Sequence, residues 1–356
     1  MRFSLTRPLF FALAAGSFLI SCTDDEPLAP SLPDTYNFSN VDYSGQQQRI
    51  QMLDMLIAEV RKANDGQTVV PASDLIAIYE NHNQLLGTSK KLEDKTHPSA
   101  KTAIYEYFNM VGELSGNPNN VVGGYLVTPE GLEPAQMIAK GLMGSLLYWQ
   151  AVGTEGYLGQ AKMNVDNTTV TEGQGTAMQH HWDEAFGYFG VPKDFPANDG
   201  TAAGATGENK AWFWGSYSNQ RAAVVDVRQE MMDAFIKGRA AIDRKDMAAR
   251  DEAIATIRQN WDLLVAANVG HYINKAIEFY GNSNETGRYY HNWSEGKAFA
   301  QALPYNPDAR ITATQYGQLQ NLIGTNPQTA TLANLQEAAL LLQQAYGFTN
   351  DQMERL

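Results

Sequence analysis

The five residues HHWDE at positions 180–184 recur as HNWSE at positions 291–295, so the pattern His-x-Trp-x-Glu stands twice in the chain, 111 residues apart. A second short match occurs in the same order, because Leu-Leu at 146–147 precedes Val-Gly at 152–153, and Leu-Leu at 263–264 precedes Val-Gly at 269–270. This second offset is 117 residues, and a loop absorbs the difference of six. Two ordered matches, one of which contains a tryptophan, predict an internal duplication.

Both copies have the spacing of an amphipathic helix. In the first copy Met178 and Phe186 each fall within about 40° of Trp182, and His180 and Glu184 lie near the opposite side. Strand-like alternation is nearly absent, so the pattern predicts an all-α fold of two pseudo-repeated helical bundles. Further helices are predicted over residues 44–60, 73–79, 98–114, 134–152, 224–242, 254–268, 289–303, 313–323 and 330–345.

The first 21 residues have the features of a targeting segment. Arg2 and Arg7 precede an apolar run, Leu9–Ile20, that is short for a membrane span. The run ends in Leu-Ile-Ser-Cys at 19–22, which resembles a lipobox, and that resemblance implies that Cys22 becomes a lipidated first residue. An ordinary secretory signal is the alternative, but the only cysteine of the chain stands where a lipobox needs it.

An acidic, proline-rich stretch follows Cys22 and predicts an unfolded tether. Beyond it, the clearest break in helical pattern is rich in glycine and proline and separates the two copies. The predicted organisation is a signal peptide (1–21), a tether (22–40), a first helical bundle (41–190), a connecting loop (191–215) and a second helical bundle (216–356).

Charge and cysteine content exclude several classes of function. Removing residues 1–21 takes away Arg2 and Arg7, so 24 basic against 39 acidic residues give the mature chain a formal charge of −15. A surface of this charge does not suit nucleic acid. With Cys22 used for the anchor, the folded body has no disulfide, thiolate nucleophile or cysteine metal site, so its chemistry depends on carboxylates, histidines, tyrosines and hydroxyls.

The doubled histidine and glutamate carry the main hypothesis about a site. On a helix, residues i and i+4 are neighbours, so His180 lies beside Glu184 and His291 beside Glu295. If the two polar faces meet, two imidazoles and two carboxylates form a shell for a divalent metal such as iron or zinc. Faces turned to water would leave two weak surface pairs, and a buried His–Glu hydrogen bond without metal is a third reading.

Other candidates are weaker. His181 is a secondary metal candidate beside the first pair. His271 follows the repeated Val-Gly of the second copy, and Glu155 lies two residues after that of the first. The protease motif His-Glu-x-x-His, a phosphate-binding glycine loop and Gly-x-Ser-x-Gly are all missing from the sequence, so no catalytic residue is assigned.

The lipobox, the duplicated halves and the segment 181–184 together resemble the imelysin-like lipoproteins. That family carries Gly-x-His-x-x-Glu, which His181 and Glu184 match, while Gln179 stands in place of the glycine. The segments 40–46 and 180–192 resemble more closely a lipoprotein family known as domain of unknown function 4856. The resemblance implies a pseudo-duplicated helical protein of the cell envelope, with imelysin relatives linked to iron acquisition.

These observations favour a non-enzymatic binding lipoprotein that holds a metal ion between two helical halves. We expect it to be lipid-anchored at the bacterial outer membrane, on the periplasmic side or the cell surface, with an envelope transporter or a metal complex as partner. A metal-dependent hydrolase of the peptidase type, with Glu184 or Glu295 as general base, is the alternative from a different class. A surface lipoprotein that binds glycans or a protein partner is a third.

Overall fold

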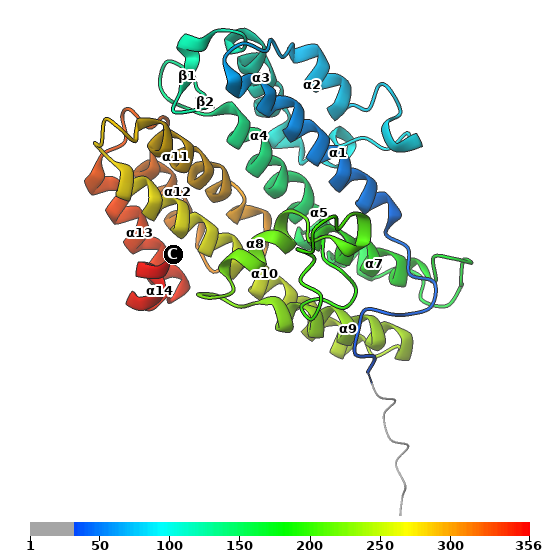
Figure 1. Cartoon of the computed structure of the whole chain (residues 1–356). Coiled ribbons are helices and arrows are strands. Elements are labelled where there is room, and N and C mark those ends of the chain that lie inside the picture. Colours follow the sequence, from blue (N-terminus) through cyan, green and yellow to red (C-terminus); the bar gives the residue numbers. More distant parts are fainter. Residues whose placement is uncertain (1–31) are drawn as a thin grey trace, which may run out of the picture. The chain divides into compact units, whose positions relative to one another are not determined.

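Helices account for nearly all regular structure in the computed structural model, which describes residues 32–356 (Figure 1). Residues 1–31, including Cys22, lie outside the described residues, as do the predicted signal peptide and most of the predicted tether. The α-helices are α1 (Ser44–Arg61), α2 (Ala72–Tyr79), α3 (Pro98–Leu114), α4 (Pro134–Leu142), α5 (Trp149–Val152), α6 (Gln160–Met163), α7 (Ala177–Phe189), α8 (Phe213–Arg221), α9 (Arg228–Arg244), α10 (Met247–Phe279), α11 (Thr286–Ala300), α12 (Ala313–Ile323), α13 (Leu332–Tyr346) and α14 (Asn350–Arg355).

Short elements connect these helices. The strands β1 (Val121–Val122) and β2 (Tyr125–Leu126) form a small antiparallel hairpin, in which Val121 pairs with Leu126. The 3-10 turns are η1 (Lys62–Asp65), η2 (Leu85–Gly87), η3 (Glu93–Lys95), η4 (Pro118–Asn120), η6 (Gly207–Asn209) and η7 (Leu303–Tyr305). The all-α prediction is confirmed, and none of the helices within residues 32–356 is long and apolar enough to cross a membrane.

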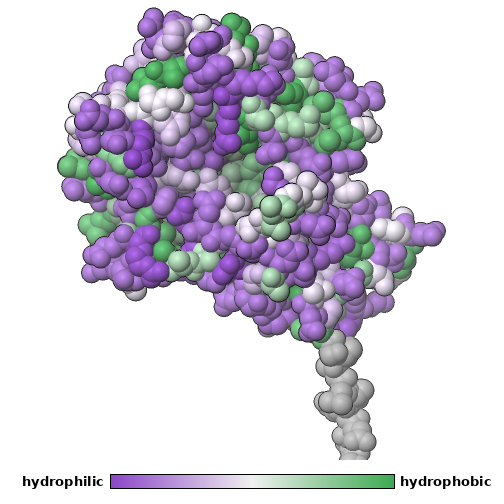
Figure 2. Space-filling model, in the orientation of Figure 1, coloured by the Kyte–Doolittle hydropathy of each residue, from purple (hydrophilic) through white to green (hydrophobic). Residues whose placement is uncertain are grey.

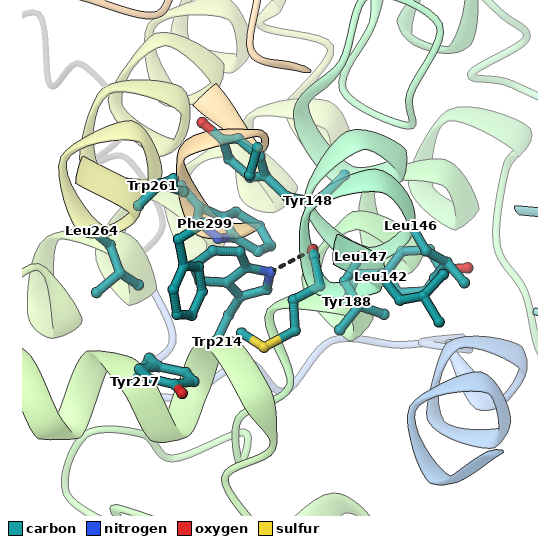
Figure 3. Close-up of a cluster of buried hydrophobic side chains, with 14 of the residues drawn as sticks. Leu142, Leu146, Leu147, Tyr148, Tyr188, Trp214, Tyr217, Trp261, Leu264 and Phe299 are labelled. Atoms are coloured by element: carbon teal, nitrogen blue, oxygen red, sulfur yellow. Dashed lines mark hydrogen bonds between the residues drawn. The ribbon is translucent and has the colours of Figure 1, made fainter. Parts of the chain in front are cut away.

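The helix predicted over residues 134–152 is continuous but changes its winding in the middle. It runs as α4, the π-helical segment η5 (Met143–Tyr148) and α5. A π-helical segment shifts backbone hydrogen bonds away from the α pattern. The indole N–H of Trp214 on α8 donates to the carbonyl oxygen of Met143 in this segment at 2.9 Å. Figure 3 shows Trp214 among buried side chains that include Tyr148 and Trp261.

Both tryptophans of the repeated motif are buried in the core. Met178, Trp182 and Phe186 of α7 are at most 5% exposed, as the predicted apolar stripe requires. The Trp182 indole donates to the carbonyl of Phe235 on α9, and the Trp293 indole donates to that of Ile323 at the end of α12. The two copies therefore share an anchoring contact, while the duplication itself remains a prediction.

Two glycines allow close approach of neighbouring helices. A Cβ on Gly187 of α7 would lie 2.7 Å from Tyr43 Cβ, so glycine lets the first turn of α1 pack against α7. A Cβ on Gly238 of α9 would collide with the ring of Trp182. These approaches place α1 and α9 on either side of α7 and so set the surroundings of the first histidine–glutamate pair.

The helix α10, 33 residues long, packs against α8, α9, α11 and α13 (Figure 1). It also contacts the first predicted half. Arg258 donates to the carbonyls of Val152 and Leu158, and Arg250 donates to that of Met163. Residues 32–356 thus form one compact unit that includes both predicted halves.

The end of the predicted tether is part of this unit. Tyr36 is fully buried, stacks on Phe186 with ring centroids 3.8 Å apart, and donates a hydrogen bond to Asp183. Folded structure therefore begins before residue 40, because an aromatic side chain in this segment finds a place in the core.

Candidate functional site

The first histidine–glutamate pair lies on α7, which begins with a capping box between Thr176 and Gln179. His180 Nε2 lies 3.9 Å from Glu184 Oε2, and the side chains are 25% and 16% exposed. Gln46 of α1 donates its amide to Glu184 Oε1 at 2.8 Å. The buried His180 Nδ1 has no hydrogen-bond partner among the described residues, so the ring is not committed to a structural contact through that atom.

Two tyrosines and two cations surround Glu184. Lys95 Nζ donates to the hydroxyl of Tyr157 at 2.9 Å. Burial raises the pKa of Tyr157, and Tyr188 and Glu184 raise it further. Burial lowers the pKa of Lys95, and the nearby Arg49 lowers it further. Glu184 therefore sits beside neutral phenols and within the field of two cations.

The second pair lies on α11 and is more deeply enclosed. His291 Nε2 is 3.5 Å from Glu295 Oε2, while His291 Nδ1 is 2.7 Å from Glu133 Oε2. Lys140 of α4 places its ammonium 3.0 Å from Glu295 Oε1. The ring of Tyr125 stacks on His291 with centroids 4.3 Å apart. Every polar group of this pair is thus already engaged by another side chain of the protein.

The protonation of His291 follows from these neighbours. Burial lowers its pKa, but the hydrogen bond to Glu133 and the charges of Glu133 and Glu295 raise it more, so its pKa lies above the ordinary value. Lys140 opposes this rise. His291 and Lys140 together contact the carboxylates of Glu133 and Glu295, which are 1% and 5% exposed.

The surroundings of the two glutamates share several residue types. Around Glu295, Tyr217 and Tyr272 meet with hydroxyls 3.1 Å apart, and burial and Glu295 raise the pKa of each. Burial lowers the pKa of Arg221 nearby. We name the two clusters the Glu184 centre (Arg49, Lys95, Tyr157, His180, Glu184, Tyr188) and the Glu295 centre (Lys140, Tyr217, Arg221, Tyr272, His291, Glu295). The residues named are one His, Glu, Lys and Arg and two Tyr in each centre, but the second pair also contacts Glu133, 2.7 Å from His291, whereas no further carboxylate forms an ion pair with His180 among residues 32–356.

The two pairs do not form a common four-residue shell. Glu184 is held by Gln46 of α1, whereas Glu295 is held by Lys140 of α4. Within residues 32–356, no three His, Cys, Asp or Glu side chains are grouped so that they could hold a metal ion. The residues present therefore offer two separate two-ligand pairs, and a closed metal shell between the halves does not fit this part of the chain.

The secondary candidates lie apart from both centres or take other contacts. His181 Nδ1 is 2.9 Å from the carbonyl oxygen of Lys162, so that nitrogen carries the proton and donates. His180, and not His181, therefore faces Glu184. Glu155 is exposed in the loop after α5. His271 on α10 is half-buried, and burial lowers its pKa to about 4.

Sequence reasoning missed the partners that other helices supply. Arg239 stands in the apolar stripe of α9, between Phe235 and Ile242, and because long cations are seldom buried without a partner, its place there was a usable signal for a buried carboxylate nearby. Lys140 lies on the face of α4 opposite Ile138 and Leu142, and its burial follows from packing that the sequence pattern does not reveal. The identity of each partner carboxylate, Asp183 or Glu295, depends on tertiary packing.

Fold and site together define an all-α protein with two histidine–glutamate pairs, one partly exposed on α7 and one enclosed on α11 beside Lys140. A family model described as a domain of unknown function (DUF4856) matches residues 115–323, and the chain belongs to this family. The matched segment extends from the end of α3 to the end of α12 and contains both pairs. No curated protein and no solved structure matches the chain significantly.

Proposed function

We propose that the protein is a non-enzymatic binding lipoprotein of the bacterial cell envelope that takes up a divalent metal ion at the His180–Glu184 pair. The observation that carries this proposal is the open state of that pair. His180 Nε2 and Glu184 Oε2 are 3.9 Å apart and partly exposed, and no lysine or arginine forms an ion pair with Glu184 among residues 32–356.

The spacing suits two ligands of one ion. Nitrogen and oxygen ligands about 2.0–2.2 Å from a tetrahedral ion lie roughly 3.3–3.6 Å from each other. A small rotation of either side chain brings His180 and Glu184 to that separation. Asp42 adds negative charge nearby, since hydrogen bonds from Ser44 and the charge of His180 keep its pKa below the ordinary value despite partial burial.

The second pair is a weaker candidate, because the protein already neutralises it. A metal ion at Glu295 must displace the Lys140 ammonium 3.0 Å away, and His291 already pairs with Glu133 at 2.7 Å. We therefore assign a structural role to the Glu295 centre and a binding role to the Glu184 centre.

Binding is favoured over hydrolysis for a geometric reason. A catalytic zinc site usually has three protein ligands and one open position. The His180–Glu184 pair supplies two ligands. Glu133 and Glu295 contact different ring nitrogens of His291, and within residues 32–356 no three such side chains are grouped so that they could hold one metal ion. Exchange of a loosely held ion, or of an ion already bound in a complex, suits a two-ligand site.

The test is isothermal titration of the full-length chain with Zn²⁺, Mn²⁺ and Fe²⁺. We expect His180→Ala and Glu184→Gln each to weaken binding by at least about tenfold, the equivalent of roughly 1.4 kcal/mol. His82→Ala is the matched control, because His82 also pairs with a glutamate, Glu80, but on the exposed surface. If His180→Ala binds like the parent, the assignment to this pair is wrong.

A further inference from the structure

A small pocket lies where the two predicted halves meet, and its lining includes no residue of either histidine–glutamate centre. It has a volume of about 260 Å³ and is bordered by α3, α4 and η5 on one side and by the end of α11, η7 and α12 on the other. Small side chains leave this space open, namely Ala100, Ala103, Gly141, Ala298 and Ala302.

The lining contains no charged residue and is rich in hydroxyl groups. Ser145 is 2% exposed, and its hydroxyl has no hydrogen-bond partner within residues 32–356. An unpaired buried hydroxyl costs roughly 1–3 kcal/mol, so a group that pairs with it gains affinity. The polar side chains around the pocket are Ser99, Tyr107, Ser145, Gln301, Tyr305 and Tyr316.

The tyrosines of the pocket stay neutral at physiological pH. Burial raises the pKa of Tyr305 to about 12 and raises the pKa of Tyr107 and Tyr316 as well. Each phenol therefore both donates and accepts hydrogen bonds and offers an apolar ring face. The pocket presents neutral donors and acceptors together with aromatic and methyl surface.

The π-helical segment places Ser145 at this position. Its carbonyl accepts a hydrogen bond from the backbone N–H of His97 at 2.8 Å. Beside it, a Cβ on Gly144 would lie 2.6 Å from Ala302 Cβ, so the backbone of η5 lies close to the turn after α11. Departures from α-helical winding of this kind are frequent at functional sites.

We propose that this pocket binds a neutral, polyhydroxylated ring the size of one hexose unit. The volume is just under the roughly 300–1,000 Å³ typical of pockets that bind drug-sized ligands, which limits the occupant to about one ring. A charged ligand would find no countercharge in the lining, and a purely apolar one would leave the hydroxyls unpaired. A sugar ring satisfies both conditions, with hydroxyls at its edge and C–H groups on its faces.

The test is ligand-observed NMR and isothermal titration of the full-length chain with D-glucose, D-galactose, D-mannose and N-acetyl-D-glucosamine. D-glucuronate serves as the charged counterpart and benzene as the apolar one. We expect at least one neutral sugar to bind with a Kd of roughly millimolar magnitude or tighter, and glucuronate and benzene to bind more weakly. Such a ring is either a free monosaccharide or the terminal unit of a glycan. Maltose and lactose distinguish these two sources, because a site for the end of a glycan also binds disaccharides and a site for a free monosaccharide does not.

Two variants with matched controls locate the binding. Gly141 lies on α4, and a Cβ there meets only Ile104 Cδ1 at an ordinary 3.6 Å, so Gly141→Leu fills the pocket without backbone strain and abolishes binding. Ser145→Ala weakens binding about 3- to 10-fold through loss of one hydrogen bond. Gly317→Leu, on an exposed face of α12, and Ser218→Ala, at a buried serine elsewhere, leave the affinity unchanged.

The proposal is overturned if none of the neutral sugars binds, if glucuronate or benzene binds more tightly than all of them, or if Gly141→Leu binds sugar like the parent. Thermal unfolding of each variant verifies that it is folded. The metal titrations do not bear on this pocket, because His180 and Glu184 are not part of its lining.

Discussion

Asp183 and Arg239 form an ion pair in the core, with Oδ1 of the aspartate 3.1 Å from Nε of the arginine. Both side chains are at most 1% exposed. Tyr36 donates a hydrogen bond to the same carboxylate oxygen, and the guanidinium also donates to the backbone carbonyl of Ser39. This one pair joins α7, α9 and the segment that leads into α1.

Removal of the arginine alone is expected to be severely destabilising. Arg239→Met leaves the Asp183 carboxylate buried without its countercharge, which costs about 3–5 kcal/mol of unfolding free energy. The double variant Asp183→Asn/Arg239→Met removes both charges and regains a large part of this loss. Urea unfolding of the three proteins tests the prediction, and a double variant no more stable than Arg239→Met contradicts it.

Gly238 and Gly317 are expected to respond in opposite directions to alanine. Gly238→Ala forces a methyl group against the Trp182 ring and destabilises the protein by about 1–3 kcal/mol. Gly317 is also helical but has open space around it, so Gly317→Ala stabilises by roughly 0.5–1 kcal/mol. Unfolding midpoints that shift in the same direction for both variants would refute the packing argument.

His291 is expected to stabilise the protein more at acidic than at alkaline pH. Its pKa is raised in the folded state, so its contribution is complete below about pH 6.5, the unfolded value, and is lost as the pH rises through the folded value. Unfolding free energies of the parent and His291→Gln, measured from pH 5 to pH 9 or thereabouts, should converge toward the alkaline end. Parallel curves would show that His291 does not titrate as described.

His271 is expected to affect the pH dependence of stability in the direction opposite to His291. Burial, followed by the charge of Arg221, lowers its folded pKa to about 4, so the unfolded chain binds the extra proton between about pH 6.5 and pH 4. Stability therefore falls across this window as the pH decreases. Because the ring is partly solvated, we expect a loss of about 1 kcal/mol, which is absent in His271→Asn. Two-state unfolding at several acidic pH values measures it.

The sequence predicted the elements of this fold better than their contacts. The apolar stripes of α7 and α11 place Trp182 and Trp293 in the core as expected, because helical periodicity is a local property. The i,i+4 rule likewise placed His180 beside Glu184. The sequence pattern does not predict the residues from other helices that contact the two pairs. Glu184 contacts Gln46 and Glu295 contacts Lys140, and these contacts depend on which helices pack together.

Neither the pocket nor the two-ligand character of the pairs could be predicted from the sequence. Alanine and glycine in a helix usually signal close packing, and nothing in their spacing separates a filled contact from the open space beside Ser145. The family motif paired His181 with Glu184, but the carbonyl of Lys162 turns that ring elsewhere. Tertiary partners of this kind are set by loops and crossing angles, which local patterns do not encode.

The bonds from α10 to the first half have a consequence for synthesis. The carbonyls of Val152, Leu158 and Met163 leave the ribosome about a hundred residues before the arginines that bind them. Tyr36 likewise binds Asp183, whose ion-pair partner Arg239 is synthesised much later. A nascent chain that ends near residue 190 thus lacks the groups that close its own interior. We therefore expect the first predicted half to complete its folding only once the second half is present.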